Sequence, residues 1–244
     1  MRVDPMSQTT ITFSIQPEVQ LRFLNSGDID EIKLLCRDWF PIDYPDSWFQ
    51  DIASNAKFYS LASVYNGKII GLIVSEVKTR SKCNKEDADI LSGSYPNTVQ
   101  VAYILSLGVA QEYRRHGIAS LLLDNLLNHL TRNESVNCKA VYLHVLTTNV
   151  AAIRFYEHRH FIHHSYLPYY YSIKGQPRDG YTYVLYINGG QPPWSLLDLF
   201  KQVGTFVSKL QPCRLPLKLL RCVHHIWKMA TTTTSRVTIT NHSS

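Results

Sequence analysis

The sequence predicts an α+β fold (mixed α/β) in which one sheet carries helices on both faces. Strand-like and helix-like segments follow one another in the order β-α-α-β-β-β-α-β-α-β-β, and this order is typical of a layered domain of that class. Of the 244 residues, 45% are hydrophobic and 18% are charged. That composition supports one good core and argues against a disordered chain. We therefore expect a single folded domain followed by a tail.

The first half of the chain predicts a strand, two helices and a hairpin. Ser26-Gly27-Asp28 offers caps for the first helix, and Pro41 ends it. Asn66-Gly67 separates two apolar runs and is the strongest short-range signal for a β-hairpin. The predicted elements are a strand at 19–23, helices at 29–39 and from 46 or 47 onward, and strands at 59–65 and 69–77.

The second half predicts strands that alternate with helices. Residues 78–97 are polar and contain Gly and Pro, so we expect a mobile surface loop there. A long tyrosine-rich connection through Gly175 and Gly180 is expected to join the last two strands. The predicted elements are a strand at 101–109, a helix that starts at 118, a strand at 140–146, a helix capped by Asn149, and strands at 161–166 and 181–187.

Turn-forming residues predict a domain boundary after the last strand. Asn188-Gly189-Gly190 and Pro192-Pro193 break the pattern of strands and helices. Two amphipathic segments follow, and the chain ends in a stretch of low complexity. The predicted organisation is a flexible N-terminus at 1–17, the folded domain at 18–188, amphipathic helices within 189–230 and a disordered tail at 231–244.

The net charge of +6 comes from the tail. Residues 1–190 contain 18 basic and 18 acidic side chains, whereas residues 191–244 contain seven basic and one acidic. In the tail, basic residues alternate with large apolar ones, including Trp227. This pattern favours contact with an anionic membrane surface over binding to nucleic acid. The alternative that these helices pack on the folded domain stays open, chiefly for the first of them.

The cysteines and histidines indicate neither a disulfide framework nor a metal site. The five cysteines include no Cys-x-x-Cys pair and indicate reduced thiols in the cytosol. No signal-peptide core and no run of 18 apolar residues is present, so any membrane contact is expected from the cytosolic side. His158, His160, His163 and His164 would scatter over several faces, and no cysteine or carboxylate set completes a tetrahedral site with them.

The stretch from the strand at 101–109 into the following helix predicts a phosphate-binding turn. Arg114-Arg115-His116-Gly117-Ile118-Ala119 lies between the two elements. Gly117 lets the main chain approach a ligand closely, and the start of the helix presents its positive end there. Because the motif sits between a strand and an amphipathic helix, which is the context it requires, we expect a phosphate-containing ligand at this turn.

Arg114, Gly117 and Ala119 fit the signature of one known family. At this turn the chain resembles the GNAT superfamily of acetyl-CoA-dependent N-acetyltransferases, which implies a mostly antiparallel seven-stranded sheet. Within that superfamily it resembles the NatF-type N-terminal protein acetyltransferases over roughly residues 18–210. The stretches that carry this closer resemblance are residues 40–45 (Phe-Pro-Ile-Asp-Tyr-Pro), 103–109 (Tyr-Ile-Leu-Ser-Leu-Gly-Val), 142–149 (Tyr-Leu-His-Val-Leu-Thr-Thr-Asn) and 167–171 (Leu-Pro-Tyr-Tyr-Tyr).

The resemblance implies three sets of site residues. Tyr103 and His144 would form the catalytic pair. The residues implied for acetyl-CoA are Leu107, Gly108, Val109, Arg115, His116, Gly117, Ile118, Ala119, Ser120, Asn149, Tyr156, Glu157, His158 and Arg159. Those implied for the peptide substrate are Phe40, Pro41, Asp43, Tyr44, Leu105, Tyr170 and Tyr171. Structural alternatives stay open: Tyr156 as a core aromatic, Asp43 as a solvated turn residue, and the tyrosines as packing between strands or as support for a homodimer.

The chemistry of the implied reaction favours an N-terminal substrate. An ammonium has no lone pair with which to attack a thioester, so the amine must first lose a proton. Near neutral pH this deprotonation costs roughly 1 kcal/mol for an α-amine and about 4 kcal/mol for a lysine. A modest base therefore suffices, and Tyr103 and His144 would take the proton directly or through an ordered water.

We expect the chain to transfer acetyl from acetyl-CoA to protein N-termini, without a metal. By resemblance, the substrates are Met-initiated N-termini of transmembrane proteins, met at the cytosolic face of the Golgi membrane, with the tail helices bound to the membrane surface. One alternative is a lysine or histone acetyltransferase, and hence a chromatin regulator, that uses the same donor site. Another is a non-catalytic adaptor that binds acetyl-CoA.

Overall fold

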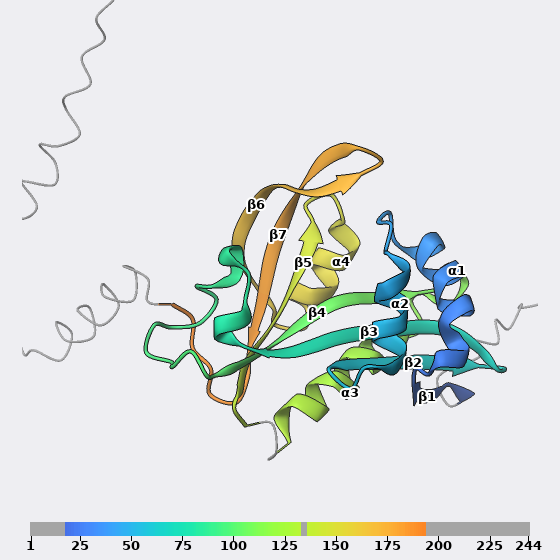
Figure 1. Ribbon diagram of the computed structural model, residues 1–244, viewed down its shortest axis with the longest axis horizontal. Helices are drawn as coiled ribbons and strands as arrows, with labels where there is room; N and C mark the ends of the chain where they lie inside the picture. The colour runs from blue at the N-terminus through green and yellow to red at the C-terminus, as the bar shows by residue number, and fades with distance from the viewer. Residues whose placement is uncertain (1–17, 133–135, 194–244) are drawn as a thin grey trace, which may run out of the picture. The chain divides into compact units, whose positions relative to one another are not determined.

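The computed structural model describes residues 18–132 and 136–193. They form a seven-stranded sheet with helices on both faces (Figure 1). The strands are β1 (Gln20–Phe23), β2 (Phe58–Tyr65), β3 (Lys68–Thr79), β4 (Gln100–Val109), β5 (Cys138–Leu146), β6 (Ile162–Ile173) and β7 (Gln176–Tyr186). The α-helices are α1 (Ile29–Trp39), α2 (Asp46–Ser54), α3 (Ile118–Thr131) and α4 (Val150–Glu157).

The sheet is antiparallel except at one pair of strands, as predicted. Its order is β1-β2-β3-β4-β5-β7-β6, and only β4 and β5 run parallel. The pairing of β4 with β5 ends at Ile104 and Leu143, although β4 continues to Val109 and β5 to Leu146. The carboxyl ends of the two strands are therefore not hydrogen-bonded to each other, and the sheet opens at this point.

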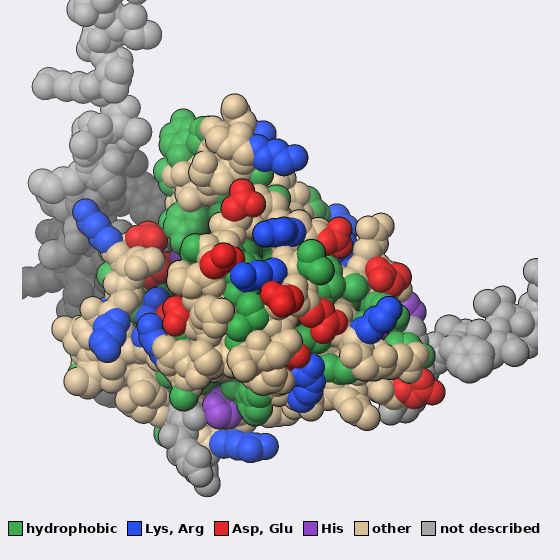
Figure 2. Space-filling model, turned by 45° about the vertical axis from the view of Figure 1, so that its right-hand side comes forward, with side chains coloured by type: hydrophobic (Ala, Val, Ile, Leu, Met, Phe, Trp, Pro, Cys, Tyr) green, Lys and Arg blue, Asp and Glu red, His purple; other side chains and the backbone are tan. Residues whose placement is uncertain are grey.

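Two apolar layers hold the helices against the sheet. On one face, Ile32 of α1 and Phe49 of α2 pack on Leu72 of β3. On the other face, Leu122 and Leu126 of α3 lie in the core that also contains residues of β2 to β5 and β7. The face of the domain shown in Figure 2 is mixed in charge, because acidic and basic side chains are interspersed over it. This agrees with the equal numbers of both signs in residues 1–190.

Several predictions made from local sequence signals are confirmed by the structure. Asn66 and Gly67 both have positive φ, 50° and 76°, in the β2–β3 hairpin, as a two-residue hairpin turn requires. Helix α1 spans the predicted residues 29–39. The side chain of Asn149 accepts a hydrogen bond from the amide of Ala152 at 3.2 Å and so caps α4.

The prediction of a mobile polar loop at 78–97 is wrong. Lys78 and Thr79 still belong to β3, and the segment that follows them is packed against the domain. The Arg80 guanidinium donates to the carbonyls of Ala88, Leu91, Ser92 and Tyr95. Inside this segment Asp87, Ile90 and Leu91 are buried. One arginine that satisfies several carbonyls can order an irregular segment without regular hydrogen bonding, and sequence periodicity does not show such a contact.

The prediction of a long tyrosine-rich connection between the last two strands is also wrong. Residues 166–171 belong to β6, and the hairpin turns at Lys174 and Gly175, which have φ values of 51° and 72°. Strand β6 contains a bulge between Leu167 and Tyr171, where Tyr169 has φ of 55°. The bulge interrupts the alternation of side chains, which is why the sequence predicted this strand only as far as residue 166.

The chain stays attached to the domain for a few residues beyond the predicted boundary at 188. The Ser92 amide donates to the Gln191 carbonyl at 3.0 Å, and the Tyr95 hydroxyl donates to the Gly189 carbonyl at 2.7 Å. The predicted flexible N-terminus at 1–17 and the tail predictions from residue 194 onward lie outside the described residues. Within the described part, no helix is both long and apolar enough to span a membrane.

Candidate active site

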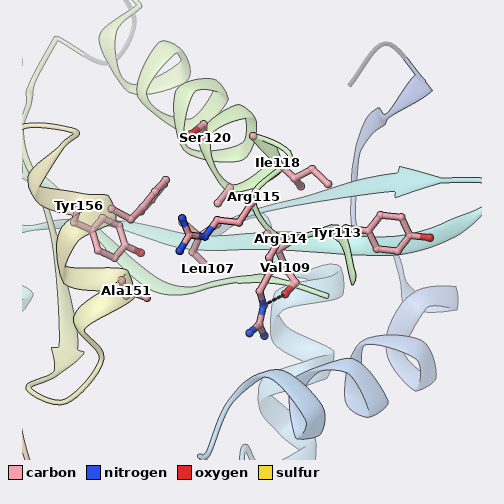
Figure 3. Close-up of a pocket in the computed structure, with 13 residues that line it drawn as sticks. Leu107, Val109, Tyr113, Arg114, Arg115, Ile118, Ser120, Ala151 and Tyr156 are labelled. Carbon is pink, nitrogen blue, oxygen red and sulfur yellow. Dashed lines mark hydrogen bonds between the residues drawn. The ribbon is translucent and has the colours of Figure 1, made fainter. Parts of the chain in front are cut away.

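A cavity of about 470 Å³ lies where β4 leads into α3 (Figure 3). Its walls come from the end of β4, the predicted phosphate-binding turn, the first turn of α3, and α4. The lining residues are Leu107, Val109, Tyr113, Arg114, Arg115, Gly117, Ile118, Ala119, Ser120, Ala151, Ala152, Phe155 and Tyr156. We refer to it as the first cavity.

The turn that borders the first cavity has the backbone of an anion-binding site. Arg115 and Gly117 have positive φ, 68° and 79°, and Gly117 is the N-cap of α3. Alternation of left-handed and right-handed residues turns successive N–H groups toward one point. The first turn of a helix also leaves its N–H groups without intrahelical partners and carries a partial positive charge. This geometry fits a diphosphate.

The two arginines of the turn have different environments. The Arg114 Nε donates to the Val109 carbonyl at 2.9 Å, the dashed line in Figure 3, and this bond fixes the turn against the end of β4. The Arg115 side chain extends between the turn and α4, on the side of Leu107 and Tyr156 (Figure 3). Arg115 is therefore the arginine whose charge is placed over the first cavity.

Eight of the residues predicted for acetyl-CoA line the first cavity: Leu107, Val109, Arg115, Gly117, Ile118, Ala119, Ser120 and Tyr156. Asn149 lines a second cavity instead. Gly108 faces α1, where an added Cβ would lie 2.6 Å from the Trp39 ring. His116, Glu157, His158 and Arg159 line neither cavity.

The predicted residues at the end of α4 have partners within the protein. Glu157 accepts a hydrogen bond from the Tyr183 hydroxyl at 2.9 Å, and Arg159 is paired with Asp124 of α3. Sequence reasoning missed Tyr113, Ala151 and Ala152, which do line the first cavity. The resemblance also implied the region around Phe155 for the coenzyme, and Phe155 does line this cavity. The small residues at 151 and 152 were the available signal, because an alanine on a helix leaves room for a ligand.

The second cavity, of about 360 Å³, holds the predicted substrate and catalytic residues. It is lined by Phe40, Pro41, Ile42, Tyr44, Trp48, Tyr103, Ile104, Leu105, Ser106, Leu107, Leu143, His144, Val145, Leu146, Asn149, Ala152, Tyr156, Tyr170 and Tyr171. Asp43, alone among the predicted substrate residues, does not line it. Leu107, Ala152 and Tyr156 line both cavities. A group bound in one cavity can therefore meet a group bound in the other along this shared wall.

A chain of side-chain hydrogen bonds runs from the second cavity into the protein. The Tyr170 hydroxyl lies 2.7 Å and the Tyr103 hydroxyl 3.1 Å from His144 Nδ1. On the other side of the ring, His144 Nε2 lies 2.8 Å from Asp87 Oδ1. The side chains of His144 and Asp87 are 2% and 1% exposed, so this pair is almost completely shielded from solvent.

The partners of the imidazole fix its protonation pattern. A carboxylate only accepts hydrogen bonds, so in the neutral imidazole Nε2 carries the proton toward Asp87 and Nδ1 presents its lone pair to the tyrosines. Burial raises the pKa of the Tyr170 hydroxyl to about 12, and burial likewise raises the pKa of Tyr103. Both hydroxyls are therefore neutral donors at physiological pH. This arrangement can receive a proton from the cavity at Nδ1 and hold the imidazolium next to Asp87.

Asp87 was missed by sequence reasoning, and Tyr170 was assigned to substrate contact alone. Asp87 lies 57 residues before His144, in the segment predicted to be a mobile loop. Tyr170 lies 26 residues after it, in the segment predicted to be a connection. Only the tertiary fold brings these groups together. In the part of the chain described by the structure, no group of three or more His, Cys, Asp or Glu side chains could hold a metal ion.

Known proteins share both this fold and much of this sequence. The model of the acetyltransferase (GNAT) family matches residues 29–161. N-alpha-acetyltransferase 60 of Danio rerio is 58% identical over 204 residues, 84% of each chain, and histone acetyltransferase MCC1 of Arabidopsis thaliana is 30% identical over 213 residues, 84% of this chain and 85% of that one.

Solved structures of a further relative have a similar fold. Arabidopsis thaliana NAA60, crystallised with a bisubstrate analogue, is 31% identical with a TM-score of 0.63, covering 70% of this chain and 99% of that one. The same protein has been crystallised with acetyl-CoA, at 30% identity and the same TM-score and coverage. The family model covers more than half of this chain, and the relatives cover most of it. The chain therefore belongs to the GNAT family of acetyltransferases.

Proposed function

We propose that this chain, an N-alpha-acetyltransferase with acetyl-CoA as the donor, acts on protein N-termini that begin with a retained Met before an apolar residue or lysine. The observation that carries the proposal is the arrangement of the second cavity. Its walls are aromatic, it reaches the hydrogen-bonded chain of Tyr170, His144 and Asp87, and it shares a wall with the first cavity.

The aromatic wall suits a methionine side chain. Tyr44 stacks on Trp48 with ring centroids 4.1 Å apart, and Phe40 meets Tyr44 edge to face at 6.0 Å. Pro41 restricts the backbone of the loop between α1 and α2. A thioether makes favourable contacts with aromatic rings and adapts its shape to them. The rings of Tyr170 and Tyr171 on β6 line the same cavity from another element and offer hydroxyl groups to a peptide.

The chain's own residues carry out the proton transfer. Acetyl-CoA supplies the thioester that the amine attacks. As the new C–N bond forms, the C–S bond of the thioester breaks and coenzyme A leaves as its thiolate, which takes a proton from solvent. The amine nitrogen loses a proton to the tyrosine hydroxyls, and His144 Nδ1 takes up a proton from them. Asp87 then stabilises the imidazolium through Nε2. Tyr103, Tyr170 and His144 all line the second cavity, whereas Asp87 does not.

Profiling with peptides tests the proposed acceptor. The full-length chain is incubated with acetyl-CoA and a library of peptides with free N-termini that differ in the first two residues. We expect peptides that begin with Met to be acetylated about 10-fold faster than those that begin with Ser or Ala, as a filled apolar pocket allows. Equal rates for all first residues would contradict the proposal.

A lysine or histone acetyltransferase is the second candidate, and it is favoured by the similarity to histone acetyltransferase MCC1 of Arabidopsis thaliana. An N-terminally blocked peptide with an internal lysine, assayed beside the same peptide with a free N-terminus, separates the two candidates. Because the lysine amine costs about 3 kcal/mol more to deprotonate near neutral pH, we expect the blocked peptide to react far more slowly. Faster acetylation of the blocked peptide would favour the second candidate.

We further propose that the tail attaches the enzyme to the cytosolic face of the Golgi membrane, where it meets the N-termini of transmembrane proteins. Support comes from the excess of basic residues among large apolar ones after residue 190. Truncation after Pro193 keeps the Ser92–Gln191 hydrogen bond of the domain. The truncated protein should no longer float with anionic vesicles, whereas the full chain should; flotation of both would contradict this proposal.

A further inference from the structure

The bulge in β6 has an unusual backbone next to the catalytic histidine. Three residues of β6, Pro168, Tyr169 and Tyr170, lie opposite the single residue Asp179 of β7. Tyr169 has φ of 55°, a left-handed conformation that a bulky L-residue rarely adopts. Its side chain is 76% exposed, so the packing of its ring does not impose this conformation. Another contact must hold the backbone there.

Asp179 supplies that contact. Its Oδ1 accepts the amide proton of Tyr169 at 2.9 Å. The Tyr169 amide, and after it the Tyr166 hydroxyl, lower the pKa of the Asp179 carboxyl. The Asp179 main-chain carbonyl accepts from the amide of Thr147, just after β5, at 3.1 Å. Asp179 therefore joins the bulge of β6 to the end of the strand that carries His144.

The bulge determines where Tyr170 points. A bulge re-aims the side chains that follow it, and a shift of one residue in a strand moves a side chain to the opposite face. Here the Tyr170 hydroxyl reaches His144 Nδ1 at 2.7 Å. The following residue of β7, Gly180, lies under the rings, because an added Cβ there would be 3.1 Å from the Tyr171 ring and 3.5 Å from Tyr170 Cβ.

We propose that Asp179 is a positioning residue for acetyl transfer: its carboxylate holds Tyr169 in the left-handed bulge, and the bulge places the Tyr170 hydroxyl on His144. This inference rests on the role of the Tyr170–His144 pair in the proposed function. Asp179 does not line either cavity, so it acts through Tyr170 and not on the substrate.

The test compares Asp179→Ala with a variant that relieves the same strain. In Asp179→Ala we expect kcat to fall about 10-fold, as small displacements of reacting groups do, with the Kd of acetyl-CoA within 2-fold of wild type. Tyr169→Gly in the Asp179→Ala background should restore most of kcat, because glycine adopts positive φ without strain. Asp179→Asn keeps an acceptor oxygen, so its kcat should fall less than that of Asp179→Ala. Tyr166→Phe, which keeps the Tyr169 hydrogen bond, is the matched control and should retain wild-type kcat.

A second comparison asks whether Asp179 acts through Tyr170. In a Tyr170→Phe background, Asp179→Ala should lower kcat by no more than a further 2-fold, because the group that it positions is already gone. Wild-type kcat in Asp179→Ala, no recovery with Tyr169→Gly, or the same 10-fold loss in the Tyr170→Phe background would overturn the inference.

His144→Ala, assayed in parallel, separates this inference from the proposed function. If His144→Ala and Tyr170→Phe lose turnover while Asp179→Ala does not, the inference alone fails. Wild-type turnover in His144→Ala would overturn both the proton-transfer role and the inference that depends on it.

Discussion

Apart from the shared wall of Leu107, Ala152 and Tyr156, the two cavities are built from different parts of the polypeptide. The first is formed largely by backbone and small or apolar side chains at the β4–α3 turn, and Arg115 supplies its charge. The second depends on side chains from β4, β5, β6 and the segment around Asp87, joined by hydrogen bonds. Binding of the donor should therefore tolerate changes in the second cavity, and turnover should not. Substitutions that affect one function without the other test this separation.

The largest effect is expected from His144→Ala. The substitution removes the proposed proton acceptor, so kcat should fall by about 100-fold or more. The Kd of acetyl-CoA, measured by calorimetry on the same protein, should stay within 2-fold of wild type because His144 does not line the first cavity. A parallel loss of acetyl-CoA binding would show that the two cavities are not independent.

Asp87→Asn should have the next largest effect. Asn can present its amide N–H to Nε2, which would put the imidazole proton on Nδ1 and remove the acceptor that the tyrosines need. We expect kcat to fall by about 10- to 100-fold with little change in the KM of the peptide. Asp89, which lies 3.1 Å from His164 and is exposed, provides a matched control. An equal loss in Asp89→Asn would point to a general effect of charge in this segment.

The pH dependence of kcat/KM should reflect the titration of the substrate's α-amine and not that of the tyrosine hydroxyls. Because burial raises the pKa of Tyr170 to about 12, its hydroxyl keeps its proton throughout the range from pH 6 to 10. An α-amine with a pKa of about 8 loses its proton within this range, so kcat/KM should rise about 10-fold per pH unit below pH 7.5 and then level off. A decline between pH 8.5 and 10 would indicate that a tyrosine titrates lower than the structure implies.

A smaller effect, on the other cavity, is expected from Gly117→Ala. A non-glycine residue at φ of 79° costs about 1–2 kcal/mol. If the turn relaxes out of the binding geometry to relieve this strain, the Kd of acetyl-CoA should rise by up to about 5- to 30-fold while kcat at saturating donor changes little. Gly175→Ala introduces the same strain at φ of 72° in the β6–β7 hairpin turn. It should leave the Kd unchanged, and a similar rise in this variant would mean that Gly117 acts only through stability.

The smallest effect should come from Arg115→Ala. Removal of one exposed charge from a phosphate site is expected to weaken acetyl-CoA binding about 3-fold, and less at high ionic strength. If the loss of acetyl-CoA affinity does not depend on salt concentration, the aliphatic part of the Arg115 side chain contributes by packing. Arg114→Ala differs, because it removes the hydrogen bond to Val109 and so destabilises the turn itself.

The same contrast explains how much could be predicted from the sequence. The hairpin at Asn66-Gly67, helix α1 and the turn at Gly117 depend on residues adjacent in the chain, and each was predicted correctly. The orientation of Asp87 toward His144 depends on a buried segment fixed by the Arg80 guanidinium. The reach of Tyr170 depends on a bulge fixed by Asp179. Neither contact leaves a periodic or local signal, so only the folded structure shows them.

A structure of this chain with a bisubstrate analogue, coenzyme A joined through an acetyl group to a peptide that begins with Met, tests the central claim most directly. We predict the coenzyme in the first cavity and the peptide in the second. Their junction should lie on the shared wall of Leu107, Ala152 and Tyr156, with the amine nitrogen within hydrogen-bonding reach of the Tyr103 or Tyr170 hydroxyl, directly or through one water. A junction away from this wall, or a peptide outside the second cavity, would contradict the account.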